Sequence, residues 1–246
     1  MVDVKQIILK PIASKPANDF IKKHHYSGKV VNNSVLHFGC FLDNRLHGVL
    51  SFGSSLDKRK VIGLVKGTKW NEFLELNRMA FDEILPKNSE SRCIAIAIML
   101  IRRNYPHIKW IISFADGVQC GDGTIYRASG FRLTGINTSA ELLRMPGGEV
   151  RHMIAMHTDK KLVFEMSGKM ASIKELAKHL NGEVMSGSQL RYVYLIDKSC
   201  KITVPILPFS KIDEMGAGMY KGQKRQIKCG NVVKEHISPT SEKVAV

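Results

Sequence analysis

Residues 88–116, NSESRCIAIAIMLIRRNYPHIKWIISFAD, decide the fold of this 246-residue chain. Asn88 or Ser89 can cap a helix that runs to about Asn104, because their side chains accept hydrogen bonds from free N–H groups of the first turn. The apolar run at 93–101 has nine residues, less than half the length that a membrane span needs. We therefore expect a helix buried in the core of a globular protein.

Apolar strands flank this helix on both sides. Residues 73–81 (FLELNRMAF) precede it, and residues 108–115 (IKWIISFA) follow it directly after Pro106. A strand, a helix and a strand of these lengths form a crossover, so the two strands are expected to lie parallel with a right-handed connection.

The remaining elements predict an α/β fold (an α+β mixed sheet). The expected order is β-α-β-β-β-α-β-α-β, with one parallel β-α-β crossover in a mainly antiparallel sheet, which is the layout of GNAT-like acyltransferase folds. The other expected elements are a strand at 4–9, a helix at 14–24 capped by Ser14, strands at 35–42 and 46–52 joined by residues 43–45, a helix at 123–129 ended by Gly130, a strand at 131–134, a helix at 173–181 with a Ser172/Glu175 capping box, and a strand at 191–196.

The character of the sequence changes twice. We expect residues 1–148 to form a GNAT-like catalytic domain, because the pattern breaks at the turn that ends in Gly148. Residues 149–215 are expected to form a C-terminal α/β extension. Residues 216–246 lose apolar periodicity and carry six basic and two acidic side chains, which predicts a flexible basic tail.

The net charge points to a polyanionic partner. The chain has 37 Lys and Arg against 22 Asp and Glu, a net charge of +15. The excess is spread over both halves, at +9 for residues 1–135 and +6 for residues 136–246. Such a balance excludes an acidic solvating protein and favours contact with nucleic acid.

Five scattered cysteines without a C-x-x-C pair fit neither a disulfide framework nor a structural zinc site. The first fifteen residues contain no apolar segment of signal-peptide length. We therefore expect a soluble, cytoplasmic protein with no membrane partner.

Polar residues follow the strand that ends the crossover. In sheets of this kind, ligands bind at the carboxyl ends of the strands, where Ser113 and Asp116 are expected. The glycine-rich loop 117–123 then opens a helix that carries Tyr126, and its backbone can approach an anion. The alternative is a plain strand-turn-helix connection that needs glycine for its positive φ angles, with Asp116 as a cap.

A second candidate group ends the first long helix, at His24-His25-Tyr26. Adjacent histidines on a helix point about 100° apart, so one of them can act as a general base or metal ligand while the other faces solvent. The alternative is a helix C-terminus that favours the charged imidazolium.

The head of the central helix is a candidate donor or anion site. It offers Asn88, Ser89, Ser91 and Arg92 with free backbone N–H groups. GNAT enzymes bind coenzyme A here through a Q-x-x-G-x-G/A turn, which this sequence lacks. Arg78, near the end of the preceding strand, can reach the same crevice or lie solvated on the strand.

Three blocks resemble the Mom family of phage DNA-modification proteins, a divergent GNAT-fold group, over about residues 20–135. The blocks are HHYSGK (24–29), ELNRMAFDEILPKNSESR (75–92) and SFADGVQCGDGTIYRASGFRLTG (113–135). The positions that match the functional motifs of this family are His25, Tyr26, Arg78, Ser89, Arg92, Ser113, Asp116 and Tyr126. Some members carry a loop histidine where this chain has Cys120-Gly121-Asp122, which moves the role of general base to His25 or Asp116.

The resemblance implies conversion of adenine in double-stranded DNA to N6-carbamoylmethyladenine, which protects phage DNA from host restriction enzymes. The adenine must be flipped out of the duplex, with Tyr26 or Tyr126 stacked on it. The product has an N–CH2 bond, so the activated two-carbon donor, acetyl-CoA or another compound, stays open. A metal held by His25 and Asp116 is compatible with the sequence but not required by the spacing.

Two other functions remain open at this point. One is a coenzyme A-dependent N-acyltransferase that acts on a protein or a small amine. The other is a non-catalytic DNA-binding module, which predicts salt-sensitive binding and no altered nucleoside.

Overall fold

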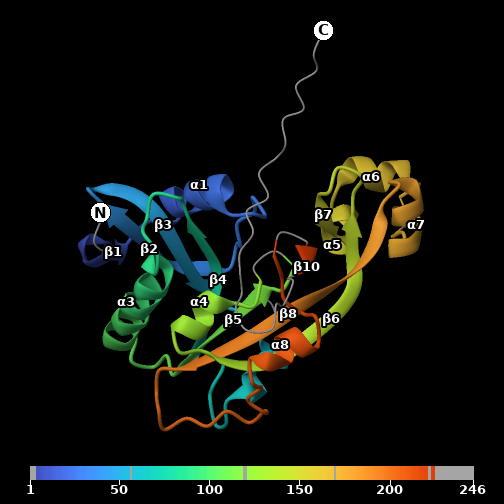
Figure 1. Ribbon diagram of the computed structural model, residues 1–246. Helices are drawn as coiled ribbons and strands as arrows, with labels where there is room; N and C mark the ends of the chain where they lie inside the picture. Colours follow the sequence, from blue (N-terminus) through green and yellow to red (C-terminus); the bar gives the residue numbers. More distant parts are fainter. Residues whose placement is uncertain (1–3, 56, 119–120, 169, 221–222, 225–246) are drawn as a thin grey trace, which may run out of the picture.

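The computed structural model describes residues 4–55, 57–118, 121–168, 170–220 and 223–224. They form an eight-stranded mixed sheet with helices on both faces (Figure 1). Its strands are β1 (Ile8–Pro11), β2 (Ser34–Leu42), β3 (Arg45–Gly53), β4 (Phe73–Phe81), β5 (Trp110–Asp116), β6 (Arg132–Arg144), β7 (Val150–His152) and β8 (Glu183–Leu195). The helices are α1 (Ser14–His24), α2 (Lys58–Val61), α3 (Ser89–Asn104), α4 (Thr124–Ala128), α5 (Met153–His157), α6 (Lys160–Glu165), α7 (Ile173–His179) and α8 (Ser210–Glu214). A separate two-stranded sheet joins β9 (Met219–Tyr220) and β10 (Gln223–Lys224).

The strand order is β1-β2-β3-β4-β5-β8-β6-β7. Only β4 and β5 run parallel among the described strand pairs, and α3 connects them. The predicted crossover and the mixed α/β fold are confirmed.

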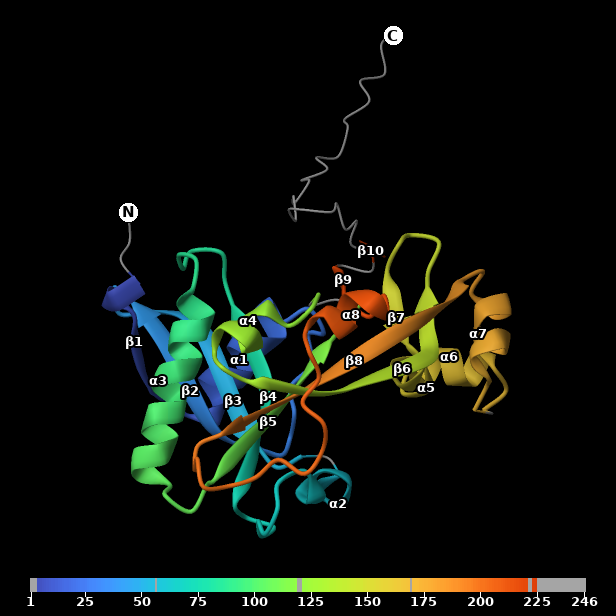
Figure 2. The same cartoon turned by 60° about the horizontal axis from the view of Figure 1, so that its bottom comes forward.

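Helices α1 and α3 cover opposite faces of the sheet (Figure 2). Neighbouring residues of β3 show this alternation, because Val49 packs with α1 and Leu50 packs in the main core with α3. We call these the α1 face and the α3 face. The apolar side of α3, with Cys93, Ile94 and Ala97, is fully buried, as the run of apolar residues predicted.

The β2–β3 hairpin is tighter than expected. Asp43 and Asn44 have φ angles of 48° and 60°, the conformation of a type I′ turn, whose twist matches the flanking strands. Arg45 already belongs to β3 and pairs with Leu42, so the loop has two residues rather than three.

Two details at the N-terminus were predicted wrongly. Residues 4–9 are not one strand, because Val4–Gln6 form a short 3-10 helix before β1. Ser14 is the first residue of α1 rather than its cap, and the cap position belongs to Ala13, which has no side chain that can accept a hydrogen bond.

The C-terminal half supplies a central strand to the same sheet. Strand β8 lies between β5 and β6 and pairs with both, and its Leu190, Tyr192 and Val193 are fully buried. The strand expected at 131–134 is therefore the buried start of the longer β6, and the strand expected at 191–196 is the buried end of the longer β8. The predicted boundary at residue 148 divides one continuous sheet.

A small lobe stands at the far end of β6 and β8 (Figure 1). Helices α5, α6 and α7 pack around their own apolar cluster, with Met156, Leu162 and Leu176 buried. The predicted capping box of α7 is confirmed, because Ser172 accepts from the Glu175 N–H and Glu175 accepts from the Ser172 N–H. Helices α5 and α6 were not predicted.

The predicted flexible tail covers residues 216–246. Only residues 216–220 and 223–224 of it are among the described residues. In the part of the chain that is described, no helix is both long and apolar enough to cross a membrane.

Candidate active site

Strands β4 and β5 pair only along their first three residues and then separate. Their parallel pairing covers Phe73 to Glu75 on β4 and Trp110 to Ile112 on β5, and then stops. Both strands continue beyond this point without pairing to each other, and we call the region between their carboxyl ends the opening. Ligands of such sheets bind at this place.

The alternation of the strands assigns the predicted residues to two faces. Arg78 and Asp116 lie on the α1 face, since Ala80 packs with α1 and Ala115 packs on the opposite, α3 face. Both residues follow the last paired residues of their strands, Glu75 on β4 and Ile112 on β5. His25, which directly follows α1, lies on this face with them, and its pKa is affected by the Arg78 charge.

His25 is neutral and has a defined tautomer. Its Nδ1 accepts a hydrogen bond from the Ser27 N–H at 3.1 Å and lies 2.8 Å from the Ser27 hydroxyl. The neutral ring therefore carries its proton on Nε2. Burial, and secondarily the positive charge of Arg78, lowers the pKa of His25 to about 4. This excludes the imidazolium that the helix C-terminus alone would favour.

Arg78 ties β4 to the loop that follows α1. Its Nε donates to the carbonyl of Lys29 at 3.0 Å, and its Nη1 donates to the carbonyl of Asn77 at 2.8 Å. The guanidinium is thereby held beside His25 rather than solvated along the strand.

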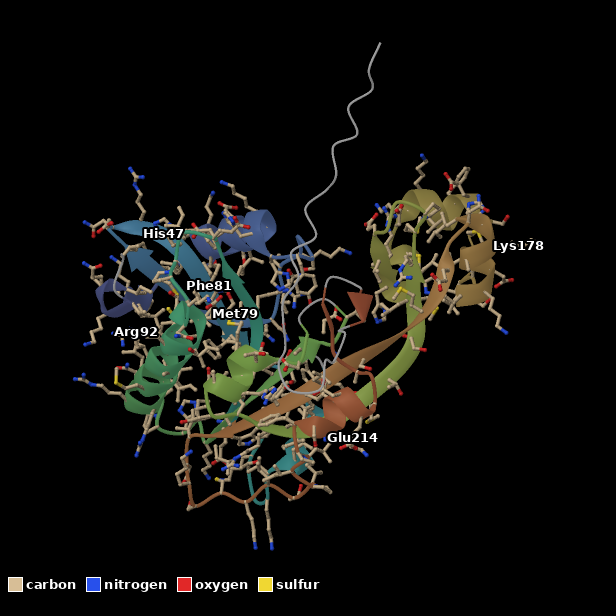
Figure 3. The ribbon with its side chains drawn as sticks, in the orientation of Figure 1. His47, Met79, Phe81, Arg92, Lys178 and Glu214 are labelled. Atoms are coloured by element: carbon tan, nitrogen blue, oxygen red, sulfur yellow. The ribbon has the colours of Figure 1, made fainter. Side chains whose placement is uncertain are left out.

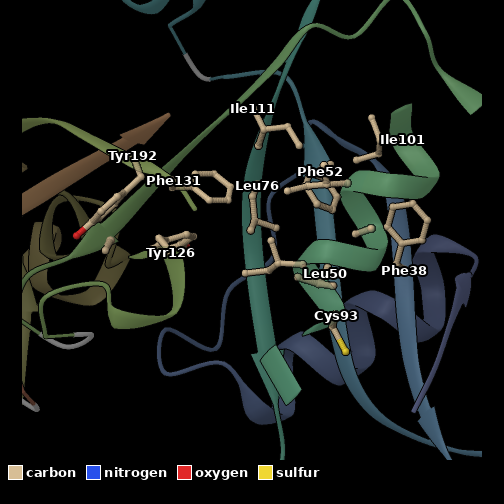
Figure 4. Packing of buried hydrophobic residues seen from close by; sticks show 14 of the residues in the cluster. Phe38, Leu50, Phe52, Leu76, Cys93, Ile101, Ile111, Tyr126, Phe131 and Tyr192 are labelled. Carbon is tan, nitrogen blue, oxygen red and sulfur yellow. The ribbon is translucent and has the colours of Figure 1, made fainter. Parts of the chain in front are cut away.

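Tyr26 and Tyr126 have opposite environments. The ring of Tyr26 is 58% exposed and lies 4.3 Å from the ring of His25. Tyr126 is buried in the core, stacked on Tyr192 at 5.1 Å and edge-on to Phe131 (Figure 4). Only Tyr26 therefore presents a ring on which a base can stack without rearrangement of the core.

Ser113 is fully buried, and its hydroxyl donates to the carbonyl of Leu76 at 3.2 Å. This carbonyl lies just past the last paired residue of β4. The side chain therefore holds the two strands together where their ladder ends, on the α3 face and apart from His25.

Asp116 begins a tightly built loop. Its Oδ1 accepts from the Val118 N–H at 2.9 Å, so the carboxylate is oriented by the turn. A side chain at Gly117 would meet the carbonyl of Ala217 at 2.3 Å, and one at Gly123, with φ of +67°, would meet the ring of Tyr192 at 2.7 Å. Packing and backbone conformation thus account for these two glycines. Cys120 lies outside the described residues.

The residues at the head of α3 are mostly engaged with each other. Asn88 has a left-handed φ of 70°, and its side chain makes no capping hydrogen bond. The buried Ser89 donates to the carbonyl of Pro86, and Ser91 donates to that of Asn88. Two predicted hydroxyl donors are therefore occupied.

The donors left at this helix end are backbone N–H groups and Arg92, whose Nε is buried without a hydrogen-bond partner. Backbone N–H groups at a helix start and a guanidinium are donors of the kind that binds anions. In Figure 3 Arg92 lies on the other side of the molecule from Lys178 in the lobe.

Glu75 was not predicted as a site residue. It lies on the α1 face, accepts a hydrogen bond from the Ser55 hydroxyl at 2.5 Å, and has its pKa raised by burial. Asn77 and Arg78 oppose that shift. The signal in the sequence is the run E-x-N-R, which interrupts the apolar pattern of 73–81.

Among the described residues, no group of three or more His, Cys, Asp or Glu side chains is placed to hold a metal ion. In this part of the chain, His25 and Asp116 therefore have no third His, Cys, Asp or Glu side chain placed with them.

Comparisons with known proteins identify the family of this chain. A family model described as the Mom protein family matches residues 6–211. Methylcarbamoylase mom of Escherichia phage Mu is 34% identical over 200 residues, 80% of this chain and 78% of that protein.

Similar solved structures are more distant. A Bacillus subtilis acetyltransferase in complex with CoA is 13% identical with a TM-score of 0.43, covering 77% of this chain and 97% of its own. The ribosomal-protein-S18-alanine N-acetyltransferase of Escherichia coli is 8% identical with a TM-score of 0.44, covering 78% of this chain and 94% of its own.

Proposed function

Because the chain belongs to the Mom protein family and is a transferase, we propose that it converts adenine in double-stranded DNA to N6-carbamoylmethyladenine and so protects phage DNA from host restriction. The observation that carries this proposal is the polar group on the α1 face of the opening. There a neutral His25, an anchored Arg78 and an exposed Tyr26 lie together.

The reaction needs a proton acceptor, because the lone pair of adenine N6 is delocalised into the ring. N6 forms a bond to the CH2 carbon of the donor, the leaving group departs with the bonding electrons, and one N6 proton is removed. In the tautomer that the Ser27 N–H bond to Nδ1 favours, His25 offers an Nε2–H donor and cannot take this proton at Nε2. The role of general base therefore falls to the carboxylate of Asp116.

His25, Tyr26 and Arg78 then position the base. The Nε2–H of His25 donates to a ring nitrogen of adenine, and Tyr26 stacks on the flipped base. Burial, helped by the positive charge of Arg78, keeps His25 neutral, and Arg78 also holds the loop after α1 against β4. This orientation supplies the near-attack geometry that a poor nucleophile needs.

The donor supplies a carbamoylmethyl carbon on a leaving group. An acetyl thioester by itself would leave an amide on N6, which is not the proposed product. The free N–H groups at the head of α3 and the guanidinium of Arg92 would hold an anionic part of the donor.

The test is to express the protein beside a plasmid, digest the plasmid to nucleosides and measure them by mass spectrometry. We expect an adenine derivative heavier by one carbamoylmethyl group in the wild type and its loss in His25→Ala. The exposed His107, beyond the C-terminal end of α3, provides the matched control His107→Ala. Unaltered adenine in well-expressed, folded wild type would refute the proposal.

A further inference from the structure

A polar pocket lies near the start of β4. It is separate from the candidate active site, because Arg78 lies toward the other end of this strand. It has a volume of about 300 Å³ and is lined by Ser54, Ser55, Asp57, Lys58, Arg59 and Trp70. None of these residues matched a motif in the sequence. We call this group, with Lys60, the Trp70 surface.

Trp70 presents a half-exposed aromatic ring. It is 50% exposed, whereas Trp110, the other tryptophan of the chain, is fully buried. The Lys58 ammonium holds Trp70 in place, because it donates to the Trp70 carbonyl at 3.0 Å and lies 5.3 Å from the centre of its ring. The same ammonium lies 5.6 Å from the ring of Phe73.

The charge around this ring is strongly positive. Segment 57–72 carries five basic side chains and two acidic ones. The acidic ones are both paired, Asp57 with Lys60 at 3.4 Å and Glu72 with Lys109 at 3.0 Å. Many nitrogen-tipped side chains project from this lower end of the molecule (Figure 3).

We propose that the Trp70 surface is a second contact with DNA, in which Lys58, Arg59 and Lys60 bind backbone phosphates and Trp70 stacks on an unpaired base. The inference rests on the proposed function for its choice of polyanion. Every base has a π-face, so a ring among cations binds single-stranded nucleic acid without sequence preference. An acidic peptide or a lipid headgroup would use the cations but leave the ring unoccupied.

The two tryptophans make the proposal measurable. We expect a single-stranded oligodeoxynucleotide to quench the fluorescence of the full-length wild type but not that of Trp70→Phe, whose remaining Trp110 reports that the core is intact. Trp70→Ala should weaken binding of this oligonucleotide about tenfold. An oligonucleotide of the same length with abasic sites should quench little, because it offers phosphates without rings.

The cations are tested by salt dependence. Neutralising Lys58, Arg59 and Lys60 to glutamine should lower the slope of log affinity against log salt by about 2. The matched control is Lys174→Gln with Lys178→Gln, two exposed lysines of α7 in the lobe, which should leave the slope unchanged.

Two results would overturn the proposal, namely equal quenching by the abasic oligonucleotide, or unchanged affinity of Trp70→Ala. Measuring adenine modification in parallel separates this failure from that of the proposed function. If adenine is modified but Trp70→Ala binds the oligonucleotide as tightly as the wild type, only the second contact is refuted. Binding through Trp70 with adenine never altered refutes only the reaction.

Discussion

The two faces of strand β4 differ in chemistry although their residues alternate along one chain. On the α3 face, Leu74, Leu76 and Met79 pack into the main apolar core. On the α1 face, Glu75 and Arg78 make polar contacts with Ser55 and with the loop after α1. The polar side chains of β4 therefore lie on the α1 face, next to the opening between β4 and β5.

This difference teaches where to look for function in the sheet. Of the predicted catalytic residues, Ser113 and Tyr126 belong with the packed face, and His25 and Asp116 belong with the polar one. Substitutions on the polar face should therefore change the reaction, and substitutions on the packed face should change stability.

Asp116→Asn should have the largest effect. The amide oxygen can still accept from the Val118 N–H, so the turn is kept while the proton acceptor is removed. We expect the rate of adenine modification to fall by about 10²–10⁴-fold with an unchanged thermal midpoint. Wild-type rates in this variant would show that Asp116 is not the base.

Leu76→Ala and Arg78→Gln test the two faces within three residues of each other. Leu76 is buried in the core, so its truncation should lower the free energy of unfolding by about 2–5 kcal/mol in denaturant titrations. Arg78→Gln should lower the modification rate more than tenfold, the loss expected when a positioning group is displaced, while costing less stability than Leu76→Ala. A reversed pattern would contradict the assignment of the faces.

The neutral state of His25 makes stability depend on pH. Because its pKa is about 4 in the folded protein and near 6.5 when unfolded, the folded state binds fewer protons. Stability that is present above pH 6.5 should be lost as the pH falls toward 4, by up to about 3 kcal/mol. His25→Gln should lack this part of the pH dependence in urea titrations at each pH.

Ser172→Ala should have the smallest effect, since it lies in the lobe on neither face of β4. Loss of the capping box should cost about 1 kcal/mol. Hydrogen exchange should speed up in α7 while adenine modification stays at the wild-type rate. A clear loss of modification would show that the lobe takes part in the reaction.

Much of the fold was predictable because its signals are local. The helix at 89–104, the hairpin at 42–45 and the capping box at 172 each depend on residues a few positions apart. The insertion of β8 between β5 and β6 was not predictable, because the paired residues of β5 and β8 lie more than seventy positions apart and no local pattern records such contacts.

The candidate site divides in the same way. By itself the sequence determined the family and supplied the candidate site residues, because a matched set of His, Tyr, Arg and Asp positions is already specific in combination. Only the tertiary structure decided that Ser113 holds two strands together, that Tyr126 is core, and that Trp70 lies among cations. The reason is physical: burial, tautomer and face depend on which distant segment packs against a residue, and that neighbour is chosen by the fold as a whole.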